Sequence, residues 1–400
     1  MSDTAAVVMP AGVDEDAGPP PGAPRLTAAA RARDLAARSG RTWVHPFALF
    51  AASRVVVIVS TAVAALLDPT RSFLQIANAW DSEFYLDIAR TGYPTTVPNA
   101  PGDNAKLVTA FFPGYSIVLK AVHEVTGWTW RYSGFTVSYV FGLTAAILLW
   151  FLVRDLRGAV VADRGVALFC FFPGSFVLSM TYSESMFIAL AVGCLWALTR
   201  RQWLIAGLLA AAATGTRSNG LALCAACAFS SGMAIYQRRE WRSLIAPVLS
   251  PVGMLAFFAY LWRHTGDARV WFKVQKYGWQ QNFDPGIFPH TVRLFFHHMT
   301  RDVNVLVIMI SSAFLLWLLC FVARSRLPAT LYVYAGVVVG MTLYAYNLEP
   351  KPRFVLTAFP FLLAPVERMR PITFQILLWM MAGGLAVLTA LSLGGIYVTP

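Results

Sequence analysis

Two acidic residues, Asp81 and Glu83, stand at the start of a short amphipathic segment in the first third of the chain. The apolar residues Trp80, Phe84 and Ile88 recur at helical spacing there, which predicts a helix lying on a membrane surface. A carboxylate held at such a surface can take a proton from an attacking hydroxyl, as a general base does. The other interpretation is structural, because acidic residues stabilise the N-terminus of any helix.

Cationic and amide side chains recur at later points where apolar runs end. Arg217 and Asn219 stand in the sequence TRSNG between two apolar stretches, and Lys351 and Arg353 stand in EPKPR after another. An arginine near the bilayer is costly unless it is paired or reaches the interface, so a functional interpretation is favoured. Clustered cations can hold a phosphate and stabilise it as a leaving group, which suits transfer from an anionic donor.

Two further segments supply candidates for substrate contact. Tyr182 and Glu184 stand in the sequence YSES beside an apolar run. Lys273, Gln275 and Trp279 lie in a long polar segment and form a mixture suited to contact with sugar or phosphate. Trp80, next to Asp81, completes the set of candidate substrate-binding residues.

Histidines in the same polar segment raise the question of a metal site. They are His264, His290, His297 and His298. They have no carboxylate at ligand spacing, so a solvated loop is the better interpretation and no metal site is predicted. Asp81 and Glu83 could bind a divalent ion, but the sequence requires no cofactor.

The tetrapeptide Phe-Phe-Pro-Gly occurs twice, at residues 111–114 and 171–174. Proline interrupts a helix, so both copies predict a break in helical structure. The second copy lies inside an apolar run. A broken helix is tolerated there only if protein groups or a cavity satisfy the freed backbone groups.

The elements that must position these residues are membrane helices. The 400 residues are 57% hydrophobic and only 13% charged, whereas soluble domains carry about 25% charged residues. Apolar runs of about 18 residues or more recur, and each is long enough to cross a bilayer. The net charge of +12 comes from short basic clusters between those runs, which is typical of cytoplasmic loops and argues against nucleic-acid binding. All five cysteines lie within apolar stretches, so no disulfide framework is expected.

The basic clusters also predict the topology. Five arginines between residues 25 and 41 precede the first apolar run and place the N-terminus in the cytoplasm. Residues 1–45 are expected to form a disordered cytoplasmic tail, and residues 46–400 a single multi-span domain. Placing the later basic clusters inside gives about eleven transmembrane helices. These spans fall near residues 47–67, 132–153, 166–181, 184–199, 203–217, 221–236, 244–262, 303–323, 328–347, 353–366 and 372–396.

The stretch 107–123 is left out of that count, because as a full span it would invert every later loop. A helix that lies in the interface, or is re-entrant, keeps the basic loops inside. Two long outer loops follow, at about residues 68–131 and 263–302, and all the candidate site residues then fall on the outer face. A transporter or flippase of lipid-linked sugars is the alternative, but its polar residues would line a pathway at mid-depth.

These motifs resemble those of the PIG-V mannosyltransferases. The resemblance rests on W-D-x-E with a following G-Y (residues 80–93), on F-F-P-G (111–114), on Y-S-E-x-x-F (182–187) and on A-T-G-x-R-S-N-G (213–220). It extends through Gln275 and Trp279 to P-R-F (352–354), and it covers roughly residues 47–370. The Ala- and Arg-rich composition suggests a bacterial member of the family.

The resemblance implies an all-α GT-C glycosyltransferase fold, with the catalytic aspartate in the first outer loop. It also implies a polyprenyl- or dolichyl-phosphate-mannose donor and an inverting displacement. Asp81 would be the general base with Glu83 beside it, while Arg217 and Asn219 would contact the donor or support the structure. The sequence thus predicts an inverting mannosyltransferase of the plasma membrane, with a cell-envelope lipid, glycan or protein as acceptor.

Overall fold

A computed structural model describes residues 44–67, 70, 72–98, 100, 108–279, 286, 289–290, 292–293, 296, 303–344 and 351–394. Within these ranges every regular element is a helix, which confirms the all-helical fold class expected from the sequence. The N-terminal tail and most of the segment 280–302 lie outside the described residues, so the expectations for them stay predictions.

Six helical segments in the described ranges are long and apolar enough to cross a bilayer, as a multi-pass membrane protein requires. They are α2 (Val44–Leu67), α6 (Trp130–Arg157), the run of η3 (Ser218–Gly220) and α10 (Leu221–Arg238), the run of η4 (Trp241–Leu244), α11 (Ile245–Leu249) and α12 (Val252–Thr265), α15 (Val303–Val322) and α19 (Pro371–Leu393). A bent pair, α7 (Ala159–Phe171) and η2 (Pro173–Ser179), qualifies as a seventh when taken together. Three shorter apolar helices are α8 (Glu184–Thr199), α9 (Trp203–Thr214) and α16 (Ala329–Tyr344).

The count of eleven spans is not confirmed. The segment 353–366, expected as one span, is divided by prolines into α17 (Pro352–Thr357), α18 (Pro360–Leu363) and the start of η6 (Val366–Arg368). Each piece is too short to cross about 30 Å of hydrocarbon. The stretch 107–123 leads into α5 (Pro113–Thr126), whose 14 residues also fall short of a span, as expected for an interfacial or re-entrant helix.

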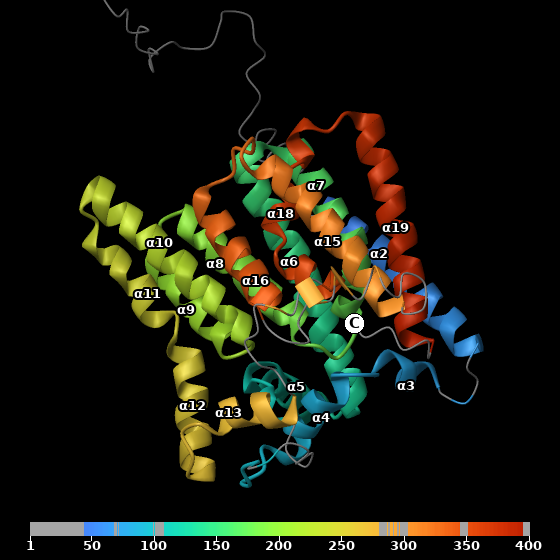
Figure 1. Cartoon of the computed structure of the whole chain (residues 1–400), viewed down its shortest axis with the longest axis vertical. Helices are drawn as coiled ribbons and strands as arrows, with labels where there is room; N and C mark the ends of the chain where they lie inside the picture. The colour runs from blue at the N-terminus through green and yellow to red at the C-terminus, as the bar shows by residue number, and fades with distance from the viewer. Residues whose placement is uncertain are drawn as a thin grey trace, which may run out of the picture. The chain divides into compact units, whose positions relative to one another are not determined.

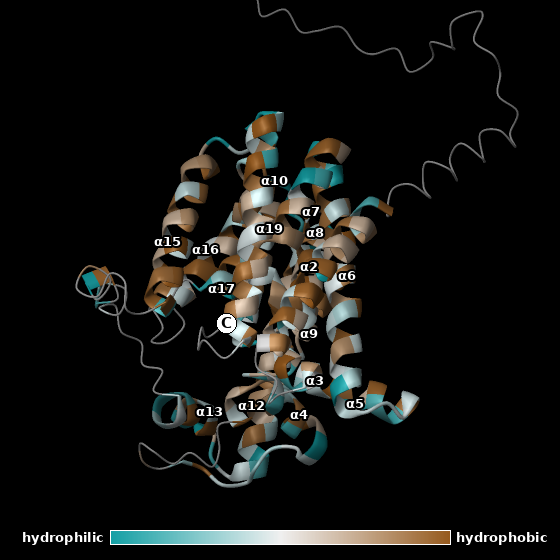
Figure 2. Cartoon of the chain, turned by 90° about the vertical axis from the view of Figure 1, so that its right-hand side faces the viewer, coloured by the Kyte–Doolittle hydropathy of each residue, from teal (hydrophilic) through white to brown (hydrophobic). Residues whose placement is uncertain are grey.

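Short helices gather at one end of the long ones. In two views at right angles, α3 (Phe73–Ala77), α4 (Ser82–Thr91), α5 and α13 (Val270–Lys273) lie at the same end (Figures 1 and 2). An apolar cluster joins α4, the start of α5 and α13 to α12, because Ile88 and Phe112 pack with Phe257 and Val270. This end also receives η3 (Ser218–Gly220) and the π-helical turn η5 (Val274–Gly278), so residues distant in sequence meet there.

The buried side chain of Arg54 in α2 donates hydrogen bonds to both sides of the break between α7 and η2, where the chain bends by 76°. Its Nη1 donates to the carbonyl of Ser175 (2.7 Å) and to Ser179 Oγ (2.9 Å). Its Nη2 donates to the carbonyl of Cys170 (3.1 Å) and to Ser175 Oγ (2.9 Å). The second Phe-Phe-Pro-Gly copy therefore breaks the helix as expected, and an arginine from another helix satisfies the freed carbonyls.

Replacing Arg54 by leucine is expected to destabilise the protein, because the carbonyl of Ser175 would lose its side-chain donor and the carbonyl of Cys170 would keep only Ser175 Oγ. A buried group left unsatisfied costs about 1–3 kcal/mol, so the melting temperature in detergent should fall by about 2–5 °C. Val55→Ala, one residue away on the exposed side of α2, is the control and should melt close to wild type. An unchanged melting temperature for Arg54→Leu would contradict the assigned role.

Candidate active site

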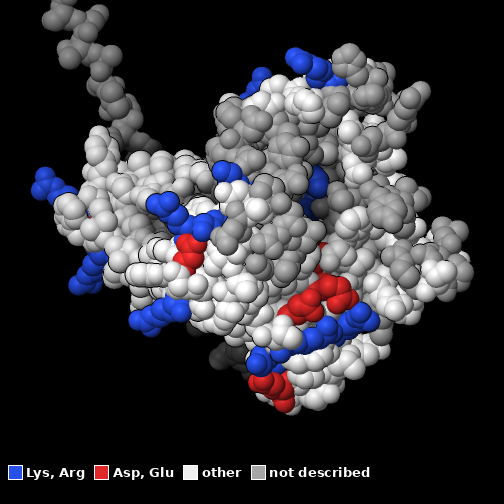
Figure 3. All heavy atoms as spheres, turned by 60° about the horizontal axis from the view of Figure 1, so that its bottom comes forward, with Lys and Arg blue, Asp and Glu red and all other residues white. Residues whose placement is uncertain are grey.

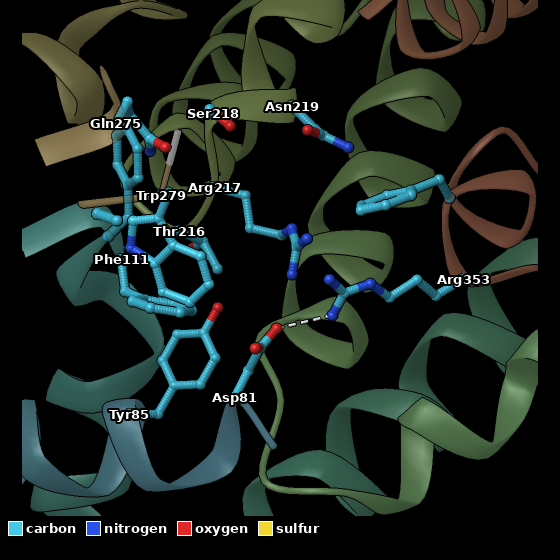
Figure 4. Close-up of a pocket in the computed structure, with 13 residues that line it drawn as sticks. Asp81, Tyr85, Phe111, Thr216, Arg217, Ser218, Asn219, Gln275, Trp279 and Arg353 are labelled. Carbon is cyan, nitrogen blue, oxygen red and sulfur yellow. Dashed lines mark hydrogen bonds and ion pairs between the residues drawn. The ribbon is translucent and has the colours of Figure 1, made fainter. Parts of the chain in front are cut away.

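A cavity of about 120 Å³ lies at the end of the bundle that carries α4 and α5. Segments from five parts of the chain line it with the residues Asp81, Tyr85, Ala110, Phe111, Phe112, Thr216, Arg217, Ser218, Asn219, Gln275, Trp279, Arg353 and Phe354. Figure 4 shows Arg217 and Arg353 on one side, Phe111 and Trp279 on the other, and Asp81 between them. Seen from this end, acidic and basic side chains lie side by side at the surface (Figure 3). The cavity thus has a cationic wall and an aromatic wall.

Asp81 is the N-cap of α4 and is held from several directions. Its Oδ2 accepts a hydrogen bond from Arg353 Nη1 at 2.7 Å, and its backbone N–H donates to Tyr182 Oη at 3.0 Å. The preceding residue, Trp80, adopts a positive φ of 62°, which is uncommon for a residue with a side chain. Its indole Nε1 donates to the carbonyl of Ser392 in α19 at 2.9 Å. This strained turn, fixed to α19, aims the carboxylate at the cavity.

Glu184 is the first residue of α8 and is only 1% exposed. Its Oε2 lies 2.7 Å from Arg217 Nη1, and its Oε1 lies 3.8 Å from Arg353 Nη1. Arg217 also donates to Ser183 Oγ at 2.9 Å. Two arginines that are 136 residues apart in sequence are therefore held by one buried carboxylate, which stands behind them and does not line the cavity.

Three buried polar atoms of cavity residues have no hydrogen-bond partner among the described residues. Asn219 Nδ2 and Arg353 Nε are donors on the cationic wall, and Gln275 Oε1 is an acceptor across from them. Buried polar groups are normally paired, so an unpaired group beside a cavity points to a ligand or water. The cavity is therefore suited to a ligand with acceptor atoms at one end and a hydroxyl at the other.

The aromatic wall is built around a π-helical turn. Gln275 belongs to η5 and Trp279 follows it directly, and such turns are frequent at functional sites. The ring of Phe111 stacks on Phe84 at 4.9 Å, and Trp279 meets both rings edge-on at 5.5 Å. The rings form a rigid apolar surface that one face of a sugar can cover.

Tyr85 stands one helical turn after Asp81 and shares a hydrogen bond with Ser183 Oγ at 2.5 Å. Burial raises the pKa of the Tyr85 hydroxyl well above its ordinary value, and the nearby Arg217 offsets this only in part. The hydroxyl therefore stays protonated at neutral pH. It can donate a hydrogen bond but is not a base.

Six of the twelve residues predicted from the sequence come together in the cavity lining: Asp81, Arg217, Asn219, Gln275, Trp279 and Arg353. Trp80, Tyr182 and Glu184 lie behind this lining and contact its charged groups or backbone.

The remaining three lie away from the cavity lining. Glu83 accepts a hydrogen bond from Arg131 Nη2 at 2.8 Å, and Lys351 is the N-cap of α17. Lys273 Nζ lies 2.7 Å from Asp267 Oδ2, and this hydrogen bond lowers the pKa of the Asp267 carboxyl. No direct contact between these three and a ligand in the cavity follows from the geometry.

Sequence reasoning missed several lining residues. They are Tyr85, Ala110, Phe111, Phe112, Thr216, Ser218 and Phe354. Tyr85 could have been found, because a residue four positions after Asp81 shares its helix face. Phe111 and Phe112 belong to the repeated tetrapeptide, and Thr216 and Ser218 flank Arg217 in its motif.

Among the described residues, no three His, Cys, Asp or Glu side chains come together as metal ligands. His297 and His298 lie outside the described residues. The expectation that no metal or cofactor is needed stays a prediction.

The chain resembles known proteins both in sequence and in fold. A family model described as "Mannosyltransferase (PIG-V)" matches residues 49–261, which is more than half of the chain. GPI alpha-1,6-mannosyltransferase 2 of Cricetulus griseus is 32% identical over 156 residues, and the same enzyme of Rattus norvegicus and of Mus musculus is 31% identical over 156. Each match covers 36% of this chain and 29% of the relative, so it spans less than a third of the relatives' length.

Solved structures of ArnT from Cupriavidus metallidurans share the fold. The structure bound to undecaprenyl phosphate aligns with a TM-score of 0.52 and 14% identity, over 84% of this chain and 62% of that one. The apo structure gives 0.53 and 15%, over 85% and 62%. This likeness confirms the GT-C type of fold, and the family match identifies the chain as a member of the PIG-V mannosyltransferase family.

Proposed function

We propose that this protein is an inverting glycosyltransferase that moves mannose from a polyprenyl-phosphate-mannose donor to a hydroxyl of a cell-envelope acceptor. The observation that carries the proposal is that Asp81 pairs with Arg353 at a cavity whose cationic wall also holds Arg217, in a chain of the PIG-V family. We place the enzyme in the plasma membrane, with the N-terminus in the cytoplasm and the cavity on the outer face.

Asp81 is the general base of the proposed reaction. The acceptor hydroxyl gives its proton to the Asp81 carboxylate while its oxygen attacks the anomeric carbon of the sugar. The bond between that carbon and the phosphate oxygen breaks, and polyprenyl phosphate leaves with the electron pair. Attack from the side opposite the phosphate inverts the anomeric centre.

Arg217 and Arg353 bind the donor phosphate in this proposal. Arg217 is paired with Glu184 and Arg353 with Asp81, so both cations lie at the cavity before the donor arrives, and Asn219 Nδ2 and Arg353 Nε offer unused donors beside them. Preorganised cations stabilise the charge that develops on the leaving phosphate. The ArnT structure of the same fold holds undecaprenyl phosphate, which supports a lipid phosphate as the donor.

The donor phosphate also competes for the arginine that holds the base. Arg353 Nη1 is bonded to Asp81 Oδ2 at 2.7 Å without a ligand. When Arg353 turns to the phosphate, the Asp81 carboxylate gives up that hydrogen bond and can accept one from the acceptor hydroxyl instead. The donor therefore prepares the carboxylate for the acceptor, and the enzyme binds its donor first.

The aromatic wall receives the sugar. Trp279 and Phe111 offer an apolar surface to one sugar face, while the unpaired Gln275 Oε1 accepts a hydrogen bond from a sugar hydroxyl. A site that hydrogen-bonds a hydroxyl rejects sugars that lack it or present it elsewhere, because its polar atom is then left unpaired. Gln275 is therefore the residue that discriminates between sugars.

Asp81→Asn is expected to abolish most sugar transfer while leaving the donor bound. Loss of a general base costs about 10²–10⁴ in rate, which is measurable as incorporation of radiolabelled mannose from polyprenyl-phosphate-mannose into membrane lipids. Asp87→Asn is the matched control, because Asp87 lies on the same helix with its side chain 53% exposed. Equal incorporation by Asp81→Asn at matched expression would remove Asp81 from the mechanism and favour a transporter of lipid-linked sugars.

Arg217→Gln and Arg353→Gln are each expected to raise the KM for the donor. A charge-assisted hydrogen bond to phosphate contributes about 1.5–3 kcal/mol, so each variant should raise KM by about 10–150-fold. Arg131→Gln removes an arginine paired with Glu83 outside the cavity and should leave the donor KM unchanged. A similar effect in all three variants would mean that the arginines act through folding.

Gln275→Leu is expected to weaken selection among donor sugars. Loss of one hydrogen bond to a sugar hydroxyl should lower kcat/KM for the mannosyl donor about tenfold, and narrow its ratio to the glucosyl donor. Gln75→Leu, at an exposed position in α3, should change neither value. An unaltered ratio in Gln275→Leu would show that another group selects the sugar.

A further inference from the structure

The two Phe-Phe-Pro-Gly copies occupy the same positions at the start of a helix, although the first begins the α-helix α5 and the second the 3₁₀-helix η2. In each copy the second phenylalanine is an extended N-cap, with φ −79° and ψ 148° at Phe112 and φ −57° and ψ 137° at Phe172. The proline is then the first helical residue and the glycine the second. Proline suits that position because its fixed φ matches the helix and its missing N–H would be unpaired there.

Both copies are anchored in the same manner. The second phenylalanine is 3% exposed in each copy, and it packs on an aromatic ring from a later helix. Phe112 packs on Phe257 of α12, and Phe172 on Phe314 of α15. The carbonyl just before each copy also accepts a hydrogen bond from a side chain. Trp271 Nε1 donates to the carbonyl of Ala110 at 3.2 Å, and Arg54 Nη2 donates to the equivalent carbonyl of Cys170 at 3.1 Å.

In each copy the glycine touches the backbone that leads into an arginine of the cavity. A Cβ on Gly114 would lie 2.8 Å from Thr216 Oγ1 and 2.9 Å from the carbonyl oxygen of Gly215, just before Arg217. Gly114 N–H also donates to that carbonyl at 2.9 Å. A Cβ on Gly174 would overlap the carbonyl of Pro352 and lie 2.8 Å from the backbone nitrogen of Arg353. A side chain at either position would push the arginine's backbone away.

We propose that each Phe-Phe-Pro-Gly copy positions the backbone of one phosphate-binding arginine, with Gly114 positioning Arg217 and Gly174 positioning Arg353. Each copy is called the seat of its arginine below. The inference rests on the proposed role of these arginines in binding the donor phosphate. It explains why one tetrapeptide occurs twice in a chain whose surrounding residues do not repeat. It also explains why both copies need glycine although neither has a positive φ.

The test is a pair of double-mutant cycles read by binding. The measured quantity is the dissociation constant of undecaprenyl phosphate for the purified full-length protein in detergent. Gly174→Ala is measured in wild type, in Arg353→Gln and in Arg217→Gln, and Gly114→Ala is measured in the same three backgrounds. Gly232→Ala is the control, because a Cβ there would meet open space.

Each glycine variant should weaken binding about tenfold in wild type, as expected for residues that act through one contact. Gly174→Ala should have less than about a twofold effect once Arg353 is glutamine, but should keep its tenfold effect in the Arg217→Gln background. Gly114→Ala should show the reverse pattern. A general loss of folding would weaken binding equally in all backgrounds, so this crossed pattern separates positioning from stability.

Equal effects of each glycine variant in all three backgrounds would overturn the inference while leaving the proposed function intact. Unchanged binding in both arginine variants would overturn the proposed phosphate role, and the seat with it. If one glycine variant fails to accumulate as folded protein, the cycle of the other copy decides, because the two seats make separate predictions.

Discussion

The buried carboxylate of Glu184, held between Arg217 and Arg353, is the interaction on which the arrangement of the site depends. An uncompensated charge at 1% exposure would cost several kcal/mol, so Glu184 requires a cation, which Arg217 supplies at 2.7 Å and Arg353 supplements at 3.8 Å. The cations in turn require a fixed anion to keep two long side chains in one orientation. Residues from α8, from the turn before α10 and from α17 are thereby held at one place. The site is organised by charge neutralisation more than by apolar packing.

Broken helices make this neutralisation possible. Arg217 precedes the short η3 turn, and Arg353 sits in α17, one of the pieces into which prolines divide the segment 353–366. A continuous span would carry its arginine into the apolar layer, whereas a short piece can end beside Glu184 and Asp81. Breaking a helix leaves carbonyls without their helical donors, and side chains such as Arg54 donate hydrogen bonds to them instead. The break between α7 and η2 therefore depends on the buried Arg54 of α2, which pairs carbonyls that the break leaves without helical donors.

The sequence could predict cavity residues that are charged and stand beside apolar runs. The residues that were chosen only because their side chains have a suitable charge lie away from the cavity lining. Asp81, Arg217 and Arg353 stand out because a charge near a bilayer is costly. Glu83 was predicted to act beside Asp81 because the two residues are close in sequence. Side chains two positions apart on a helix point about 200° apart, so the Glu83 side chain faces Arg131 instead. Lys273 was selected as a cation, and its partner Asp267 lies only six residues away. The expected span 353–366 was counted on its apolar residues, although it contains Pro360 and Pro365, and the structure divides it at these prolines.

The charges of the two carboxylates and two arginines can be followed through the proposed reaction. Without a ligand, Asp81 and Glu184 balance Arg217 and Arg353, so the buried cluster is neutral. A bound donor phosphodiester brings one negative charge. During transfer the phosphate gains a second negative charge as it leaves, while Asp81 loses its own by taking the acceptor proton. The net charge of the cavity is then the same before and after the bond is broken.

In a low-dielectric site, a reaction that conserves local charge avoids the desolvation penalty that a new buried charge would incur. Because Arg353 is bonded to Asp81 while no donor is present, the proposed reaction has this arginine exchange the carboxylate for the phosphate when the donor binds.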